Sequence, residues 1–311
     1  MNSQASEHPQ LAWKIPTTIV ACALFAALVP QVVGVYYVSV ALTLCMWIAL
    51  AQSWTLLSGM AGYISLGHVV FYGLGGYVVV VTWQVLPLWV SIPLAGVTAG
   101  LFAAAIGVPV LRVRGPYFVI LTFGIAELIK FIVLNVEASI AQGGRLMFGT
   151  PSVVSLYYVM LALAAAGTVL AWSVRRSRLG AGLVAIREDE EAAETVGVPV
   201  ARYKVYAFIL SAIVPGMVGG VMGLRLTYVE VTQLFNPIIS FTIVTMAIIG
   251  GSDDARGPIL GATFLVVLSE LLWSNLPQLY MIILGALLVS FVLFAPGGIV
   301  GLLHRTGRVT R

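Results

Sequence analysis

The residues whose types and spacing could do chemistry are few, and the clearest are two opposite charges inside an apolar stretch. Glu127 and Lys130 stand in GPYFVILTFGIAELIKFIVLN, three positions apart, so on a helix they share a face and can pair. Charges in such surroundings are costly and often mark ion pathways, although a pair that only neutralises itself explains the pattern equally well. Of the other polar residues in apolar runs, we expect Glu270 near a boundary or paired with a neighbouring helix, and His68 as a packed polar residue.

No pattern in the chain predicts catalysis. The phosphate-binding sequence G-x-x-x-x-G-K-[ST] is absent, so ATP is not bound by that route. No His, Cys and carboxylate residues have the spacing of metal ligands, and Cys22 and Cys45 lie apart in apolar runs, so we expect no metal, disulfide or cofactor. No basic stripe with interleaved aromatic residues indicates nucleic-acid binding. The sequence therefore predicts a protein that is not an enzyme.

The only long hydrophilic stretch covers residues 175–204. Its run from Arg187 to Val196 lacks Gly and Pro and predicts one short amphipathic helix, ended by Gly197 and Pro199. Four consecutive acidic residues stand early in that run, where the helix dipole favours negative charge. The run contains the pattern E-A-A-x-x-x-G, made by Glu191, Ala192, Ala193 and Gly197. Small alanines let a helix seat closely on a partner and acids supply charge complementarity, whereas the alternative is a solvated connector.

Two glycine-rich segments interrupt the apolar pattern. The first, residues 58–77, begins with a polar part that could expose backbone groups to a substrate pathway, formed by Gly59, Gly62, Ser65 and Gly67. Its later glycines are explained at least as well by close helix packing, and they are Gly73, Gly75 and Gly76. The second segment, residues 248–264, reads IIGGSDDARGPILGATF. Because the two segments occur in corresponding halves, they allow an internal inverted repeat.

The composition of the chain limits which elements can position these residues, because 60% of its residues are hydrophobic and only 9% are charged. A soluble domain carries roughly 25% charged residues. The apolar runs approach the ~20 residues that one helix needs to cross a bilayer, and lipid admits only helices or closed barrels. The predicted fold class is therefore all-α, a polytopic integral membrane protein with about ten transmembrane helices. We place them at 16–33, 36–57, 66–84, 87–111, 116–137, 153–174, 205–226, 236–251, 257–275 and 277–296.

The Lys and Arg residues are divided unequally between the two ends of these spans. Thirteen of the 16 fall on one side, whereas Arg145 and Arg225 fall on the other and Lys130 lies within a span. The positive-inside rule then places both termini in the cytoplasm. We expect the first apolar run to be a retained helix and not a signal peptide. The predicted organisation is a single membrane domain over 1–311, with a cytoplasmic coupling loop at 175–204 and a cytoplasmic tail at 303–311.

Several segments taken together resemble one family. In chain order they are LLSGMAGYISLGHVVFYGLGGYV, RGPYFVILTFGIAELIKFIV, SRLGAGLVAIREDEEAAETVGVPVARYKVYAFILSA, GGSDDARGPILGATF and FAPGGIVGLL. They resemble the LivM-type permeases of branched-chain amino acid ABC transporters over roughly residues 40–303. Two segments depart from the common form, namely Ser252–Arg256 and the middle of the loop AQGGRLMFGTPS, and both bear on the substrate more than on the fold.

The resemblance implies an importer subunit of the bacterial inner membrane that carries branched-chain amino acids, or a related small amino acid or amide such as urea. It implies ATP hydrolysis by two cytoplasmic ATPase subunits, a second permease of the LivH type and a periplasmic substrate-binding protein. Carried onto this sequence, it implies ATPase coupling by Glu191, Ala192, Ala193 and Gly197. Its glycine-rich segment matches Gly59, Gly62, Ser65 and Gly67, and its fifth-span acid matches Glu127, with Lys130 beside it.

Two other functions are compatible with the sequence. A stand-alone ion-coupled secondary transporter of small polar metabolites would account for the repeat and for the Glu127–Lys130 pair. A membrane scaffold or sensor that transports nothing is the third reading, and the chain shows no attached soluble domain to favour it. Topology alone leaves the importer and the secondary transporter near parity, and the resemblance favours the importer.

Overall fold

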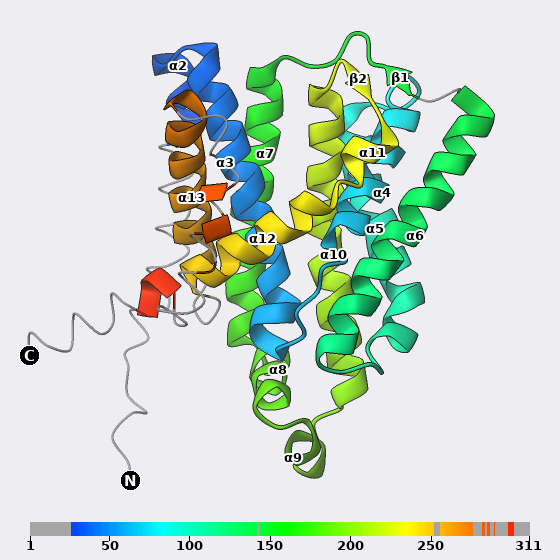
Figure 1. Cartoon of the computed structure of the whole chain (residues 1–311), viewed down its shortest axis with the longest axis vertical. Coiled ribbons are helices and arrows are strands. Elements are labelled where there is room, and N and C mark those ends of the chain that lie inside the picture. The colour runs from blue at the N-terminus through cyan, green and yellow to red at the C-terminus, as the bar shows by residue number, and fades with distance from the viewer. Residues whose placement is uncertain are drawn as a thin grey trace, which may run out of the picture.

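The computed structural model describes residues 26–141, 144–251 and 256–275, with a few further positions between 282 and 301. They form an elongated bundle of helices (Figure 1). In chain order the elements are α2 (Val29–Val32), α3 (Val35–Trp54), the π-helical turn η1 (Thr55–Gly59), α4 (His68–Thr82), α5 (Leu88–Val110), α6 (Pro116–Ala141), β1 (Arg145–Leu146), α7 (Val153–Arg176), α8 (Arg178–Glu188), α9 (Glu190–Thr195), α10 (Val200–Arg225), β2 (Tyr228–Val229), α11 (Val231–Leu234), α12 (Pro237–Gly250) and α13 (Gly257–Asn275).

Six helices in the described residues are long and apolar enough to cross a membrane. Two shorter apolar helices, His68–Thr82 and Gly257–Leu272, accompany them. The all-α class is therefore confirmed, and eight of the predicted spans coincide with helices. The count of about ten is not confirmed, because the predicted spans 16–33 and 277–296 lie mostly outside the described residues.

Several helices begin at Pro, Asn or Ser residues of the sequence, which favour helix starts. Pro237 opens α12, and the side chain of Asn236 accepts a hydrogen bond from the Ile238 amide at 3.0 Å. The hydroxyl of Ser152 caps α7 and that of Ser177 caps α8 in the same way. Each cap satisfies an amide that has no partner within its own helix.

Helix α10 lies at the centre of the bundle, packed on α4 and α5, while α3 packs on α7 (Figure 1). The backbones of α4 and α10 touch. A Cβ atom added at Gly75 would lie 2.0 Å from the Gly216 carbonyl oxygen, and one at Gly219 would lie 1.9 Å from the Tyr72 carbonyl oxygen. Small residues permit this approach between membrane helices, so the packing interpretation of the later glycines is confirmed.

The second glycine segment packs α12 on α13. A Cβ atom added at Gly250 would lie 1.9 Å from the Gly257 carbonyl oxygen. One added at Gly261 would lie 1.9 Å from the Met246 carbonyl oxygen. Residues 252–255 of that segment lie outside the described residues. The inverted repeat stays a prediction.

The predicted single helix from Arg187 to Val196 is wrong, because the chain forms two helices, α8 and α9, with a break at Asp189. The Asp189 backbone is extended, and its side chain accepts hydrogen bonds from the amides of Glu191 at 2.9 Å and Ala192 at 3.0 Å. An acid that caps the following helix in this way competes with continuation of the preceding one. The predicted stop is confirmed, since Gly197 has a φ of +87°.

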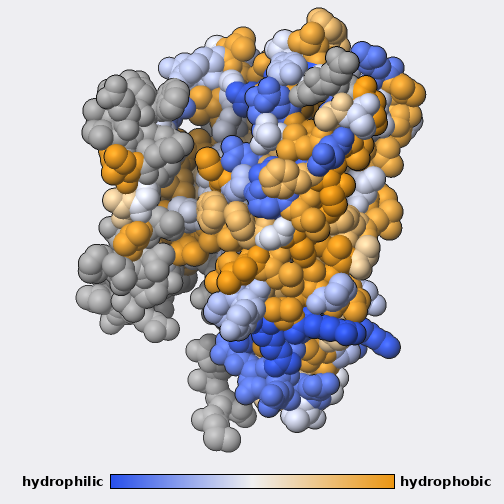
Figure 2. All heavy atoms as spheres, turned by 45° about the vertical axis from the view of Figure 1, so that its right-hand side comes forward, coloured by the Kyte–Doolittle hydropathy of each residue, from blue (hydrophilic) through white to orange (hydrophobic). Residues whose placement is uncertain are grey.

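The helix that matches the predicted span 205–226 starts before that span. Helix α10 begins at Val200, so Lys204 belongs to a helix and not to the loop. The polar side chains of α8 and α9 gather at one end of the molecule, which we name the α8–α9 end, and an apolar band lies above it (Figures 1 and 2). A band of this kind suits a surface that faces lipid.

Candidate functional site

Four segments meet in a polar cluster at the α8–α9 end, which we name the Lys204 cluster and define as Tyr63, Arg114, Glu190 and Lys204. The Lys204 ammonium lies 2.6 Å from Glu190 Oε1 and 3.0 Å from the Tyr63 hydroxyl. The Tyr63 hydroxyl donates to Glu190 Oε2 at 2.8 Å, and Arg114 Nη2 lies 3.1 Å from Glu190 Oε1. The cluster thus joins the start of α9 to the start of α10, the α5–α6 connection and the segment before α4.

The Lys204 cluster holds the Lys204–Glu190 ion pair away from water, whereas Arg114 at its edge is exposed. The side chain of Lys204 is only 6% exposed and that of Glu190 only 14%. Partial burial raises the pKa of the Glu190 carboxyl, but hydrogen bonds from Lys204 and Tyr63 and the charge of Arg114 lower it more, so the net pKa lies below its ordinary value. The carboxylate is therefore ionised at neutral pH, and the pair is hydrogen-bonded as a buried ion pair must be.

A second link joins α8 to the turn before α4. Arg187 Nη1 donates to the Gly59 carbonyl oxygen at 2.9 Å. Gly62 has a φ of +76°, and a Cβ atom there would lie 2.9 Å from Arg187 Cγ, so the aliphatic part of the arginine rests on this glycine. Sequence reasoning assigned these glycines to a substrate pathway, whereas the geometry brings them to α8.

The remaining glycine-segment residues form a braced, non-helical connection. The Ser65 carbonyl oxygen accepts from Trp54 Nε1 at 2.9 Å, and its hydroxyl accepts from the Gly67 amide at 3.2 Å. The Leu66 amide donates to Thr122 Oγ1 on α6 at 3.2 Å. π-helical turns are frequent at functional sites, and non-helical backbone is tolerated at membrane depth where protein buries it or where it lines a water-filled cavity. The pathway role of these residues stays a prediction.

The four residues predicted to couple to an ATPase lie together on and after α9. Glu191 and Ala192 are exposed, Ala193 is buried against the bundle, and Gly197 is exposed at the end of the helix. Helix α9 projects furthest from the bundle at this end (Figure 1). The arrangement presents an acidic, small-residue surface while Ala193 anchors the helix.

The intramembrane charges behave as their spacing predicts. Glu127 and Lys130 form an ion pair along α6, and both side chains are partly exposed. Neither contacts the Lys204 cluster. His68 is fully buried and meets Phe71 edge to face with ring centroids 5.8 Å apart, so its role as a packed polar residue is confirmed.

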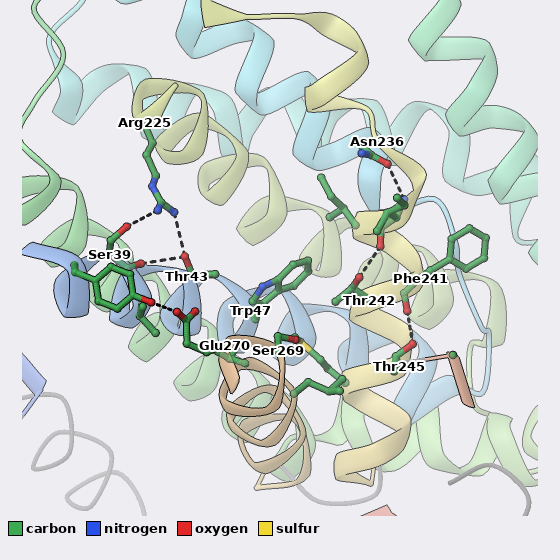
Figure 3. A pocket seen from close by; sticks show the side chains of 18 residues that line it. Ser39, Thr43, Trp47, Arg225, Asn236, Phe241, Thr242, Thr245, Ser269 and Glu270 are labelled. Carbon is green, nitrogen blue, oxygen red and sulfur yellow. Dashed lines mark hydrogen bonds between the residues drawn. The ribbon is translucent and has the colours of Figure 1, made fainter. Parts of the chain in front are cut away.

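A cavity of about 630 Å³ opens at the other end of α10, between α3, α12 and α13. Figure 3 shows Arg225 reaching down to Ser39 and Thr43, and Glu270 below them on α13. Arg225 Nη1 donates to Thr43 Oγ1 at 3.1 Å and Nη2 donates to Ser39 Oγ, while the Tyr36 hydroxyl donates to Glu270. Glu270 is thus paired with a neighbouring helix, as the sequence predicted.

Sequence reasoning missed the Lys204 cluster and the cavity residue Arg225. Lys204 was counted only as a basic residue of a loop, and its partner Tyr63 is 141 positions away. One signal was present, because Lys204 directly precedes an apolar run and a charge there needs a partner. Arg225 is a lone arginine at the other end of the same apolar run, and its charge needs a partner for the same reason.

The fold and these sites define a polytopic helical membrane protein with a polar element at one end of its bundle and, toward the other end, a cavity that carries Arg225 and Glu270. Within the part of the chain that the structure describes, no group of three or more His, Cys, Asp or Glu residues could hold a metal ion.

Comparison with known proteins identifies the family. The family model described as "Branched-chain amino acid transport system / permease component" matches residues 36–292. The high-affinity branched-chain amino acid transport system permease protein LivM of Salmonella typhimurium is 28% identical over 90% of this chain and 74% of its own length, and LivM of Escherichia coli K12 gives the same values. A probable branched-chain amino acid transport permease protein LivH of Methanocaldococcus jannaschii is 25% identical over 55% of this chain and 53% of its own length. No solved structure matches.

The chain belongs to the branched-chain amino acid transport permease family. It is therefore a permease component of a membrane transport system, and the resemblance read from the sequence is confirmed.

Proposed function

We propose that this chain is the membrane permease subunit of an ATP-binding-cassette importer in a bacterial inner membrane, with both termini cytoplasmic. Its substrates are branched-chain amino acids, or a related small amino acid or amide such as urea. It forms one membrane domain and works with a second, LivH-type permease, two ATPase subunits that hydrolyse ATP and a periplasmic binding protein. The names of its relatives support the transport class.

The observation that carries the proposal is the way α9 is attached. It presents Glu191 and Ala192 to the outside, and the Lys204 cluster ties its first residue, Glu190, to α10. Arg187 ties α8 to the turn before α4. A displacement imposed on α8 and α9 by an ATPase would therefore reach α10 and the turn before α4 through charged hydrogen bonds, which are stronger than neutral ones.

The proposed coupling surface is tested by a substitution that leaves the fold intact. Ala192→Arg places a long side chain on an exposed position of α9, whereas Thr227→Arg makes the same change on an exposed position at the opposite end. We expect Ala192→Arg to lose the ATPase subunits on gentle detergent purification and to lose at least about tenfold in ATP-dependent leucine uptake, since close seating on a partner excludes bulk at its centre. Thr227→Arg should keep the ATPase subunits.

If Ala192→Arg keeps both the ATPase subunits and ATP-dependent uptake, the α9 surface does not couple the permease to the ATPase. The secondary-transporter reading predicts a different result, namely a chain that purifies alone and takes up substrate in vesicles under an ion gradient. The Glu127–Lys130 ion pair gives that reading no added support, because each charge already has its partner on the same helix.

A further inference from the structure

Two opposite charges face the 630 Å³ cavity, and neither has a charged partner among the residues that the structure describes. Among the described residues, the Arg225 side chain donates hydrogen bonds to the hydroxyls of Ser39 and Thr43, and no carboxylate in that part of the chain lies within ion-pair distance of it. Glu270 accepts from the Tyr36 hydroxyl, and no described Lys or Arg forms an ion pair with it. Both side chains are partly buried. Charges in a membrane helix bundle are stabilised by partners, so a cavity that leaves one of each sign unpaired is suited to a ligand that brings both opposite charges.

The sequence places the two charges close together along one helix. Tyr36, Ser39 and Thr43 follow the spacing i, i+3, i+7 and so share one face of α3. Glu270 bonds to the first of them and Arg225 to the other two. The contact points are one to two helical turns apart, which is about 5 to 10 Å along the axis. Figure 3 shows both charged side chains directed at this stretch of α3.

The opposite wall of the cavity offers acceptors for a cation. The hydroxyls of Thr242 and Thr245 on α12 donate to the carbonyl oxygens of Ile238 and Phe241, each at 2.8 Å. Their protons are thereby committed, and the oxygens keep lone pairs that can accept from an ammonium group. Both residues line the cavity (Figure 3).

The rest of the lining is apolar. Trp47, Met246 and Val266 contribute wall surface beside the charged and hydroxyl groups. The volume lies within the roughly 300–1,000 Å³ that small-ligand sites enclose, and the mix of an apolar wall with a few fixed polar groups is typical of them.

We propose that this cavity binds a free amino acid as its zwitterion, with the α-carboxylate on Arg225, the α-ammonium on Glu270 and an aliphatic side chain against Trp47, Met246 and Val266. The proposal rests on the transport function proposed above and narrows it. A neutral amide such as urea would leave both charges unpaired, so the site selects amino acids against amides.

The experiment measures ligand-dependent thermal stabilisation of the full-length chain, purified in detergent with its bound membrane partners and without any soluble binding protein. The probes are leucine, isoamylamine, which lacks the carboxylate, 4-methylpentanoate, which lacks the ammonium group, and urea. Because a ligand that binds the native state raises the melting temperature with its concentration, we expect a rise with leucine up to about 10 mM and a clearly smaller rise with the other three.

Four variants test whether Arg225 and Glu270 bind the two charged groups of the ligand. Arg225→Gln and Glu270→Gln should each weaken the leucine response at least about tenfold, since each removes a charge-assisted hydrogen bond to the ligand. Arg202→Gln and Glu194→Gln make the same changes on exposed residues at the α8–α9 end and should respond as the unchanged chain does. If Arg225→Gln or Glu270→Gln fails to fold, Arg225→Lys and Glu270→Asp replace them, and the four probes on the unchanged chain still decide.

A urea response equal to that of leucine, no leucine response, or normal responses in Arg225→Gln and Glu270→Gln would overturn the proposal. ATP-dependent leucine uptake by the whole complex is measured in parallel. If the complex takes up leucine but leucine does not stabilise the purified chain, the importer function stands and the proposed amino-acid site is rejected. A leucine-specific response without any ATP-dependent uptake keeps the site and removes the proposed importer.

Discussion

At the scale of single residues, Lys204 links three other segments at the α8–α9 end through its ammonium group. Its ammonium reaches Glu190, Tyr63 and the Leu111 carbonyl oxygen, and its side chain is 6% exposed. Removing one member of a buried pair leaves the other charge uncompensated, which costs about 3–5 kcal/mol. Lys204→Met should therefore lower the free energy of unfolding by about that amount, measured from thermal or denaturant melts in detergent.

The control is the double variant Lys204→Met with Glu190→Gln. It removes both charges and should recover part of the loss, because a neutral pair leaves no buried unpaired charge. A double variant as unstable as Lys204→Met alone would show that the loss came from packing and not from the ion pair.

The same cluster predicts a pH dependence at the residue scale. The pKa of Glu190 is lowered in the folded chain, so its contribution to stability is fully present above the ordinary value of 4.5 and is lost as pH falls through the lower, folded-state pKa. The stability difference between the unchanged chain and Glu190→Gln should be constant from pH 7 to about pH 5 and should shrink in more acidic buffer. Melts of both proteins across that range check it, and a difference that grows toward low pH would contradict the assignment.

At the scale of elements, the contact between α4 and α10 is set by glycine. Gly75→Ala puts a Cβ atom 2.0 Å from the Gly216 carbonyl oxygen, so the two helices must separate. Such overpacking costs about 1–3 kcal/mol or more. Gly124→Ala on α6 is the matched control, because nothing lies within 4 Å of the added atom. We expect the yield of folded protein and its melting temperature to fall for Gly75→Ala and to stay unchanged for Gly124→Ala.

At the scale of the whole molecule, the charge distribution predicts an orientation that labelling can measure. In a chain with Cys22→Ser and Cys45→Ala, a cysteine is introduced at Gln233 on α11 or at Glu194 on α9, both of which are exposed and lie at opposite ends. A membrane-impermeant maleimide added to intact cells should label Gln233→Cys and should label Glu194→Cys only after permeabilisation. Labelling in the reverse order would place the α8–α9 end outside.

The sequence was sufficient for the positions of eight spans, because their apolar runs are long and are separated by Pro, Gly and charge. It was also sufficient for the packing glycines and for Gly197. It was insufficient for the break at Asp189, where a side-chain cap overrides continuous helix propensity, and for the Lys204 cluster, whose members come from four distant segments. Arg225 and Glu270 were visible as charges, but only folding brings both to one cavity.

Helix α10 carries the Lys204 cluster at its first turns and Arg225 at its last residue. These two residues are 21 positions apart, which is about 32 Å along a helix axis. Since α4 and α10 are in backbone contact, no side-chain layer lies between them, so we expect the two helices to move together if α10 tilts. A tilt of about 5° over that length displaces the far end by about 3 Å. If an ATPase displaces α9 as proposed, the Lys204 cluster passes the movement to the start of α10. The resulting shift of the Arg225 guanidinium would be long enough to make or break the contact proposed with a ligand carboxylate.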